Sequence, residues 1–135
     1  MDISVGDRAT RSLTLTAEHV EQYAQLSGDR NPLHFDEEFS AATPFGRLVV
    51  QGGLTTGLLH ALVAMDLPGP GTVFMTQEWK FTAPVFIDDT ITAEAEVLKL
   101  HDTKPVTTLG ITVRRQDDEV VLAGEAVCYT FPGPQ

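Results

Sequence analysis

The sequence predicts an α+β fold in which one buried helix is followed by an antiparallel sheet. Residues 54–66 are apolar on nearly every helical face, with Leu54, Leu58 and Leu62 at four-residue spacing. A helix of that kind is expected to be buried. Most of the chain after residue 72 alternates apolar and polar residues, as half-buried strands do. A sheet wrapped around the helix would satisfy both patterns.

The first part of the chain is predicted to contain a strand and then helices. Residues 8–15 alternate weakly and indicate the strand. Thr16 has the chemistry of an N-cap, and the helix that it begins is expected to end at Gly28, because glycine readily adopts the left-handed conformation of a C-cap. A short helix is expected over 36–42, followed by a loop.

The second part of the chain is predicted to be the sheet. Two prolines and two glycines within 67–71 end the long helix. Acidic turns separate most of the later segments, which alternate as strands should. The four strands are expected over residues 73–81, 91–98, 109–113 and 119–131.

Length and composition narrow the functional classes. A chain of 135 residues is long enough for one real core, so 1–135 is predicted to be a single domain. A net charge of −10 argues against nucleic-acid binding. The sequence lacks a membrane span and a signal-peptide profile, so we expect a cytoplasmic protein with no membrane association. One cysteine and four scattered histidines give no case for a metal, and no cofactor is expected.

The segment 28–34, which reads Gly-Asp-Arg-Asn-Pro-Leu-His, holds the residues best suited to chemistry. Asp29 and His34 lie five residues apart in a stretch predicted not to form a regular helix, because Pro32 lacks an amide hydrogen and disfavours helical geometry at Asn31. Either residue alone is more often a turn or packing residue. Together, a carboxylate and an imidazole form an acid–base pair that can activate water near neutral pH.

The complete run resembles the signature of the MaoC-like, (R)-specific enoyl-CoA hydratase family, in which an aromatic and a small residue precede Gly-Asp-x-Asn-Pro-aliphatic-His. Here Tyr23 and Ser27 precede the run, and the small residue Ser40 follows at the expected distance. The resemblance implies a hot-dog fold, in which an antiparallel sheet wraps around a central helix. It also implies a hydro-lyase that adds water reversibly to a trans-2-enoyl thioester to give an (R)-3-hydroxyacyl thioester, with Asp29 and His34 as the catalytic pair.

The tripeptide Gln51-Gly52-Gly53 directly precedes the buried helix. Amides in the first turn of a helix are unpaired and carry partial positive charge, which suits an enolate-like thioester oxygen. We therefore predict that the Gly53 amide polarises the thioester carbonyl, with Gly52 as the alternate donor. The glycines could instead serve only tight packing. Relatives usually read His-Gly-Met here, so Gln51 and Gly53 depart from the family pattern, and Gln51 is assigned to substrate binding.

Asn31 and His60 complete the predicted substrate-binding set. Asn31 is expected to tie down the loop rather than to perform chemistry. His60 lies on the same helical stripe as Thr56, near a position where relatives often carry a serine. A polar residue on a buried helix needs a partner, so His60 is expected to bond to Thr56 or to a second subunit, or to trim the acyl tunnel. The structural role is favoured.

The expected substrate is an acyl-CoA or an acyl-carrier-protein thioester. One alternative function is therefore a (3R)-hydroxyacyl-carrier-protein dehydratase of fatty-acid or polyketide synthesis, and a second is a non-catalytic hot-dog binding subunit. The intact Asp29–His34 pair counts against the second. A thioesterase is less consistent, because hot-dog thioesterases generally carry an acid on the buried helix and 54–65 contains none.

Two further expectations concern charge and assembly. Coenzyme A is polyanionic, so the few basic residues should gather near its phosphates. A half-barrel of this size leaves one sheet edge and one end of the helix uncovered, so a homodimer or higher homo-oligomer is expected. The sequence does not rank the candidate cations, which are Arg30, Arg47, Lys80, Arg114 and Arg115.

Overall fold

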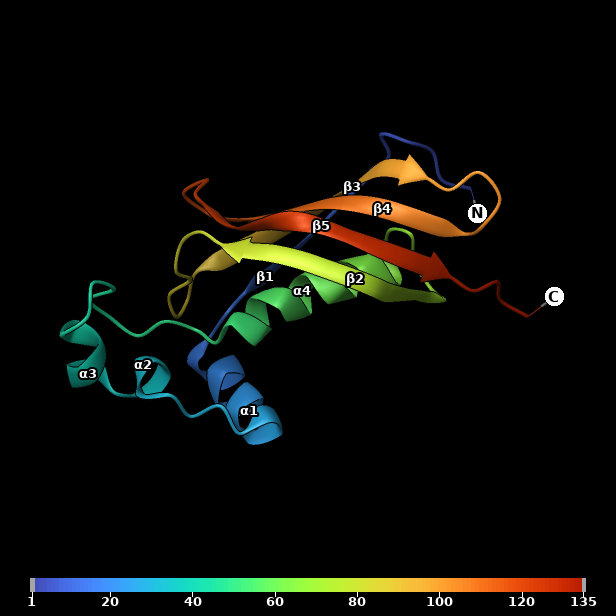
Figure 1. Ribbon diagram of the computed structural model, residues 1–135. Coiled ribbons are helices and arrows are strands. Elements are labelled where there is room, and N and C mark those ends of the chain that lie inside the picture. Colours follow the sequence, from blue (N-terminus) through green and yellow to red (C-terminus); the bar gives the residue numbers. More distant parts are fainter. Residues whose placement is uncertain (1, 135) are drawn as a thin grey trace.

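One helix, α4 (Gly52–Met65), packs along one face of a five-stranded antiparallel sheet (Figure 1). The computed structural model describes residues 2–134. The strand order is β1-β3-β4-β5-β2, so β1 and β2 form the two edges. This sheet around a central helix is the hot-dog fold. The strands are β1 (Arg8–Thr14), β2 (Thr72–Phe81), β3 (Thr90–Leu100), β4 (Val106–Arg115) and β5 (Val120–Thr130).

The core lies between α4 and the concave face of the sheet. Leu59 and Leu62 of α4 are fully buried, as are the small residues Ala93 and Ala95 of β3, the strand against which the helix packs most closely. The alternation of buried and half-buried residues along β3 is the pattern expected of a strand with one core face. The sheet covers only one side of α4, however, and Gly57 on the other side is exposed.

Three shorter helices gather at the end of the molecule where α4 begins, away from both chain termini (Figure 1). They are α1 (Ala17–Ser27), α2 (Pro32–Phe35) and α3 (Glu37–Ala41). Thr16 caps α1 as predicted, by accepting from the amide of His19. Gly28 ends the helix with φ of 83°, in the left-handed region. Both boundaries of α1 therefore match the sequence prediction.

The segment around Pro32 corrects one prediction. Residues 32–35 form one helical turn, whereas we expected no helix there. Proline is favoured in the first turn of a helix, where its missing amide hydrogen is not needed, and Asn31 supplies the cap by accepting from the amide of Leu33. The restriction that Pro32 imposes on Asn31 therefore marks the start of a helix rather than its absence.

The other boundaries differ by a few residues. The long helix begins at Gly52 rather than at residue 54, and the short helix predicted over 36–42 is α3. β4 begins at Val106, earlier than the predicted 109, and the hydroxyl-bearing Thr107 on it is fully buried. Among residues 2–134, no helix has the length and apolar character needed to cross a membrane.

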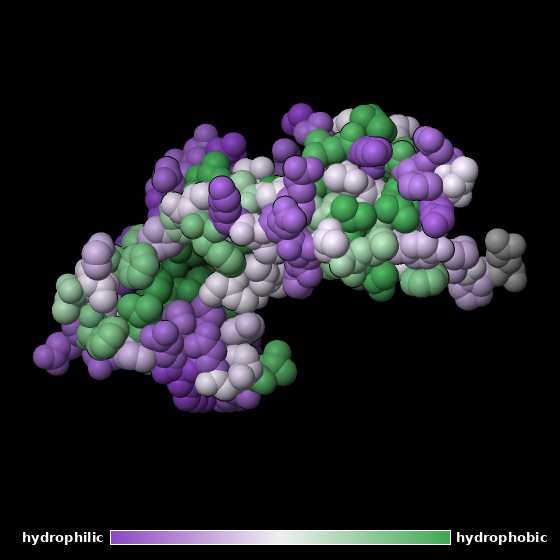
Figure 2. All heavy atoms as spheres, in the orientation of Figure 1, coloured by the Kyte–Doolittle hydropathy of each residue, from purple (hydrophilic) through white to green (hydrophobic). Residues whose placement is uncertain are grey.

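Apolar side chains also reach the surface. Figure 2 shows a recessed apolar region where α3 and the loop after it approach the end of the sheet. A second group of apolar residues is exposed on β2, which pairs only with β5 and leaves its other edge open. The members of that group are Val73, Met75 and Phe81.

Candidate active site

The structure brings Asp29 and His34 together at the junction of α1 and α2. Atom Nε2 of His34 lies 3.6 Å from Oδ1 of Asp29. The His34 side chain is 9% exposed and the Asp29 side chain 41% exposed, so the imidazole is enclosed while the carboxylate meets solvent. The gap is too wide for a direct hydrogen bond, and it leaves room for both atoms to bind one further group, such as a water molecule.

A main-chain carbonyl sets the tautomer of His34. Atom Nδ1 lies 2.7 Å from the carbonyl oxygen of Val49. Because a carbonyl oxygen can only accept, Nδ1 must carry the hydrogen. The neutral imidazole therefore carries its lone pair on Nε2, the ring atom that lies 3.6 Å from Asp29.

Short-range hydrogen bonds shape the loop that carries Asp29. The hydroxyl of Ser27 donates to the carbonyl of Tyr23 and accepts from the Asp29 amide at 3.1 Å. The Asn31 amide donates to Oδ1 of Asp29 at 3.3 Å, while Oδ1 of Asn31 accepts from the Leu33 amide at 3.1 Å. Asn31 thus holds the loop on one side and caps the helix of His34 on the other. This is the tying role expected of it.

The carbonyl of Leu33 connects α2 to two other segments. It accepts from the buried hydroxyl of Ser40 at 2.9 Å and from the amide of Val49 at 3.1 Å. The first bond fixes α2 against α3, and the second fixes it against the segment that leads into α4. Ser40, the last small residue of the motif, therefore holds the turn that carries His34.

Two glycines occupy the first turn of α4, and each has a close neighbour. By helix geometry, the amides of Gly52 and Gly53 have no acceptor within the helix. A Cβ atom on Gly53 would overlap the hydroxyl of Tyr23, which reaches over from α1. A Cβ atom on Gly52 would lie 3.2 Å from the ring of Phe81. The close approach of these rings requires glycine at position 53 and leaves little room at position 52.

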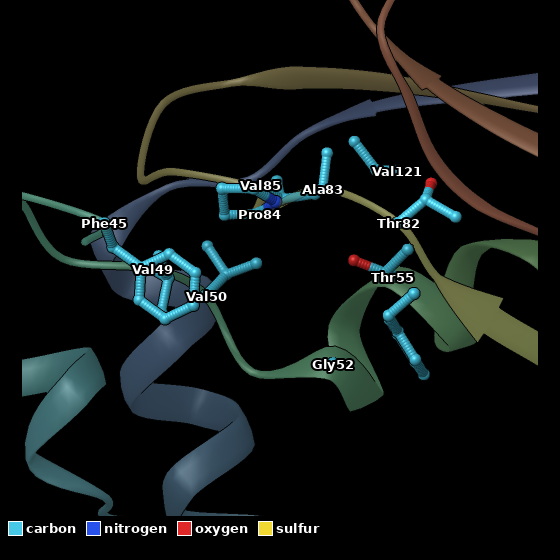
Figure 3. Close-up of a pocket in the computed structure, with 11 residues that line it drawn as sticks. Phe45, Val49, Val50, Gly52, Thr55, Thr82, Ala83, Pro84, Val85 and Val121 are labelled. Atoms are coloured by element: carbon cyan, nitrogen blue, oxygen red, sulfur yellow. The ribbon is translucent and has the colours of Figure 1, made fainter. Parts of the chain in front are cut away.

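A cavity of about 340 Å³ opens beside this turn (Figure 3). Sequence analysis missed Thr55, a buried residue whose hydroxyl points into the cavity; the only signal was a polar pair at 55–56 within an apolar helix. Neither Asp29 nor His34 lines the cavity, but Val49 lines it and also binds His34 through its carbonyl. The lining residues are Phe45, Val49, Val50, Gly52, Thr55, Phe81, Thr82, Ala83, Pro84, Val85 and Val121.

Gln51 and His60 take positions that the sequence did not specify. Gln51 is fully buried, and its amide nitrogen Nε2 donates to main-chain carbonyls. His60 does not bond to Thr56, whose hydroxyl donates to the Gly53 carbonyl. Instead, Nε2 of His60 lies 2.8 Å from Oε1 of Gln77 on β2, and this oxygen cannot donate, so His60 must be the donor.

The candidate cations divide into paired and unpaired groups. Side-chain hydrogen bonding to Asp117 raises the pKa of the Arg115 guanidinium and lowers the pKa of the Asp117 carboxyl. Arg30 and Arg114 likewise lie within 4 Å of Glu21 and Asp118. Arg47 stacks 3.8 Å from the centre of the Phe86 ring. Among residues 2–134, Arg47 and Lys80 form no ion pair. The same residues include no group of three or more His, Cys, Asp or Glu arranged to hold a metal ion.

A hot-dog fold with a carboxylate–imidazole pair beside the start of its central helix defines a class of hot-dog proteins equipped for acid–base chemistry. The chain belongs to the MaoC-like domain family, whose model matches residues 5–119. It is 40% identical over 125 residues to the (R)-specific enoyl-CoA hydratase of Aeromonas caviae, a match that covers 93% of each chain. It is 39% identical over 126 residues to the 3-hydroxybutyryl-CoA dehydratase of Methylorubrum extorquens, covering 93% of this chain and 80% of that protein.

Solved structures give the same family. The (R)-hydratase from A. caviae involved in PHA biosynthesis superposes with a TM-score of 0.91 at 38% identity, covering 96% of this chain and 98% of that one. The R-hydratase PhaJ1 from Pseudomonas aeruginosa superposes with a TM-score of 0.90 at 32% identity, covering 98% and 84%. The predicted fold and family are thus confirmed.

Proposed function

We propose that the chain is an (R)-specific enoyl-CoA hydratase, a hydro-lyase that adds water reversibly to a trans-2-enoyl-CoA to give an (R)-3-hydroxyacyl-CoA. The observation that carries the proposal is the geometry of Asp29 and His34. Nε2 of His34, which carries the lone pair of the neutral ring, lies 3.6 Å from the partly exposed carboxylate of Asp29. The 40% identity to a protein of that name supports the same conclusion.

In the proposed reaction, Asp29 and His34 hold one water molecule over the β-carbon of the substrate. As the water oxygen bonds to that carbon, one member of the pair takes a proton from it. A proton passes from the pair to the α-carbon on the same face, so the pair ends the turnover unchanged. A positioned acid–base pair of this kind typically contributes about 10² to 10⁴ in rate.

The amides at the start of α4 are proposed to polarise the thioester carbonyl as charge develops on its oxygen. We include both Gly53 and Gly52, and two observations favour Gly52. Gly52 lines the cavity, whereas the hydroxyl of Tyr23 covers the Cα of Gly53. One donor of this kind is typically worth about 3 kcal/mol of the barrier.

Coenzyme A is the favoured carrier. Identity to the two CoA-named relatives is 40% and 39%, against 29% for the mitochondrial 3-hydroxyacyl-[acyl-carrier-protein] dehydratase of Arabidopsis thaliana. We propose that Arg47 and Lys80, which have no acidic partner among residues 2–134, are available for the phosphates. His60 is proposed to have a structural role, because it does not line the cavity and its hydrogen bond to Gln77 ties α4 to β2.

We further propose a homodimer formed across the open edge of β2. An unpaired strand edge that carries exposed apolar residues favours pairing with a second copy. The uncovered side of α4, which includes Gly57, supports the same arrangement. A cytoplasmic location for this single domain completes the proposal, and the free, buried thiol of Cys128 suits a reducing compartment.

Hydration of crotonyl-CoA by the purified chain tests the proposal, followed by loss of the ultraviolet absorbance of the conjugated thioester. Asp29→Asn should lower kcat by roughly 10² to 10⁴. Asp36→Asn is a matched control in the same segment. Asp36 caps α3 by accepting from the Phe39 amide, and asparagine caps equally well. Near-normal turnover by Asp29→Asn, or no turnover by the wild-type chain, would refute the assignment.

A further inference from the structure

The side chain of Gln51 contacts α1 and the Asp29 loop, both of which are far from Gln51 along the sequence. Its side chain is fully buried in front of α4, and Nε2 donates to the carbonyl of Val20 on α1 at 2.9 Å. The same nitrogen reaches the carbonyl of Asp29 at 3.4 Å. A primary amide carries two hydrogens, so one side chain can serve both carbonyls. The opposite amide orientation would set Oε1 against both carbonyl oxygens and is therefore excluded.

Both members of the acid–base pair are thereby attached to one three-residue segment. His34 is attached through the carbonyl of Val49, and Asp29 is attached through the side chain of Gln51, two residues later. The segment 49–51 therefore holds both residues from one side, in addition to the bonds from Ser27 and Asn31 that shape the Asp29 loop. A shift of Asp29 alone would have to break the Gln51 contact.

The second polar atom of Gln51 shows that packing alone does not explain this residue. Oε1 is buried and has no hydrogen-bond partner among residues 2–134. A buried acceptor without a donor is unfavourable, and an apolar side chain would avoid that cost. Gln51 is nevertheless present here, and the nitrogen of the same amide donates to the main chain of Asp29.

We propose that Gln51 is a positioning residue that holds the Asp29 loop at its working distance from His34. The inference rests on the proposed hydratase function and deepens it, because it assigns Gln51 to the geometry of the pair rather than to contact with substrate. The number of donors at position 51 determines how well the loop is held. Glutamine offers two hydrogens, a neutral histidine offers one, and leucine offers none.

The test compares Gln51→Leu and Gln51→His with the wild-type chain in crotonyl-CoA hydration. A small misplacement of reacting groups can cost roughly 10² in rate, so Gln51→Leu should lower kcat by about that factor and change KM far less. Gln51→His should fall between. The pH profile of kcat/KM and the midpoint of the His34 titration, followed by NMR of its ring protons, should both shift in Gln51→Leu, since a displaced carboxylate interacts differently with the imidazole.

Thr107→Val is the matched control, because Thr107 is also fully buried and its hydroxyl has no hydrogen-bond partner within residues 2–134, but it lies on β4. It should leave kcat, the pH profile and the His34 titration unchanged. The inference is overturned if folded Gln51→Leu keeps the wild-type kcat and His34 titration. If Gln51→Leu does not fold, the same result for Gln51→His overturns it. A wild-type chain without hydratase activity, but with a His34 titration that moves in Gln51→Leu, would refute the proposed function while leaving the positioning role standing.

Discussion

Replacing Gly53 with alanine tests whether α1 packs directly on the first turn of α4. The new Cβ atom would overlap the hydroxyl of Tyr23 and lie 2.7 Å from its ring carbon Cε1. Ordinary contact between carbon atoms requires about 3.5–4.0 Å. Tyr23 is half-buried, so its ring must turn away or the two helices must separate. Overpacking of this kind costs about 1–3 kcal/mol in the free energy of unfolding.

Urea unfolding followed by the fluorescence of Trp79, the single tryptophan, measures this free energy. Because Tyr23→Ala removes the overlap, the doubly substituted chain should be more stable than the sum of the two single losses by about 1–3 kcal/mol. Activity reports the same contact, since α1 leads through Gly28 into Asp29. Gly53→Ala should therefore also lower kcat, by roughly tenfold to a hundredfold.

Gly57 provides a control on the same helix. A Cβ atom there meets nothing within 4 Å, so Gly57→Ala should stabilise the protein by about 0.5–1 kcal/mol. A loss instead would indicate that a second copy covers this side of α4. Direct packing of Tyr23 on Gly53 is refuted if Gly53→Ala is as stable as Gly57→Ala, or if the effects of Tyr23→Ala and Gly53→Ala add to within about 0.5 kcal/mol.

Two further predictions concern Asn31 and Cys128. Asn31→Ala removes the cap on α2 and should lower the free energy of unfolding by about 1 kcal/mol, whereas Asn31→Asp keeps the cap and should keep the wild-type free energy of unfolding. Loss of turnover in a fully stable Asn31→Asp chain would mean that Asn31 takes part in chemistry. Burial raises the pKa of the Cys128 thiol to about 11, so native protein should not react with Ellman's reagent at pH 8 until it is unfolded, and rapid labelling of the native state would contradict this. Because the folded value exceeds the ordinary 9.0, stability should be retained below pH 9 and decline as the pH rises toward 11, and Cys128→Ala should flatten that decline in urea titrations.

The features that sequence predicted well are those satisfied by near neighbours in the chain. The cap at Thr16 bonds three residues away, and Gly28 needs only its own backbone conformation. Alternation along β3 reports directly which face of a strand is buried. Pro32 shows the limit of such signals, because the same residue that excludes a continuing helix is well suited to begin one.

The features that sequence did not predict depend on residues far apart along the chain. The carbonyl of Val20 that Gln51 binds is 31 residues away, and that of Asp29 is 22 residues away. The packing of Tyr23 on Gly53 and the bond from His60 to Gln77 depend likewise on how helices and strands meet. The periodic pattern of apolar residues along a sequence does not specify which helix contacts which strand. The sequence predicted that one end of the helix is uncovered but not that a whole side of α4 is, since apolar residues mark a buried surface without saying whether the same chain buries it.

Main-chain atoms, rather than other side chains, hold much of the candidate site. His34 is oriented by the Val49 carbonyl, and Gln51 binds only carbonyl oxygens. A carbonyl offers the same acceptor whatever side chain its residue carries, so these supports survive changes of sequence around them. This explains how the chain departs from the His-Gly-Met pattern at Gln51 and Gly53 and still brings Asp29 to 3.6 Å from His34. At position 51 the amide of Gln51 supplies the donor, and at position 53 the ring of Tyr23 occupies the space that a side chain would fill.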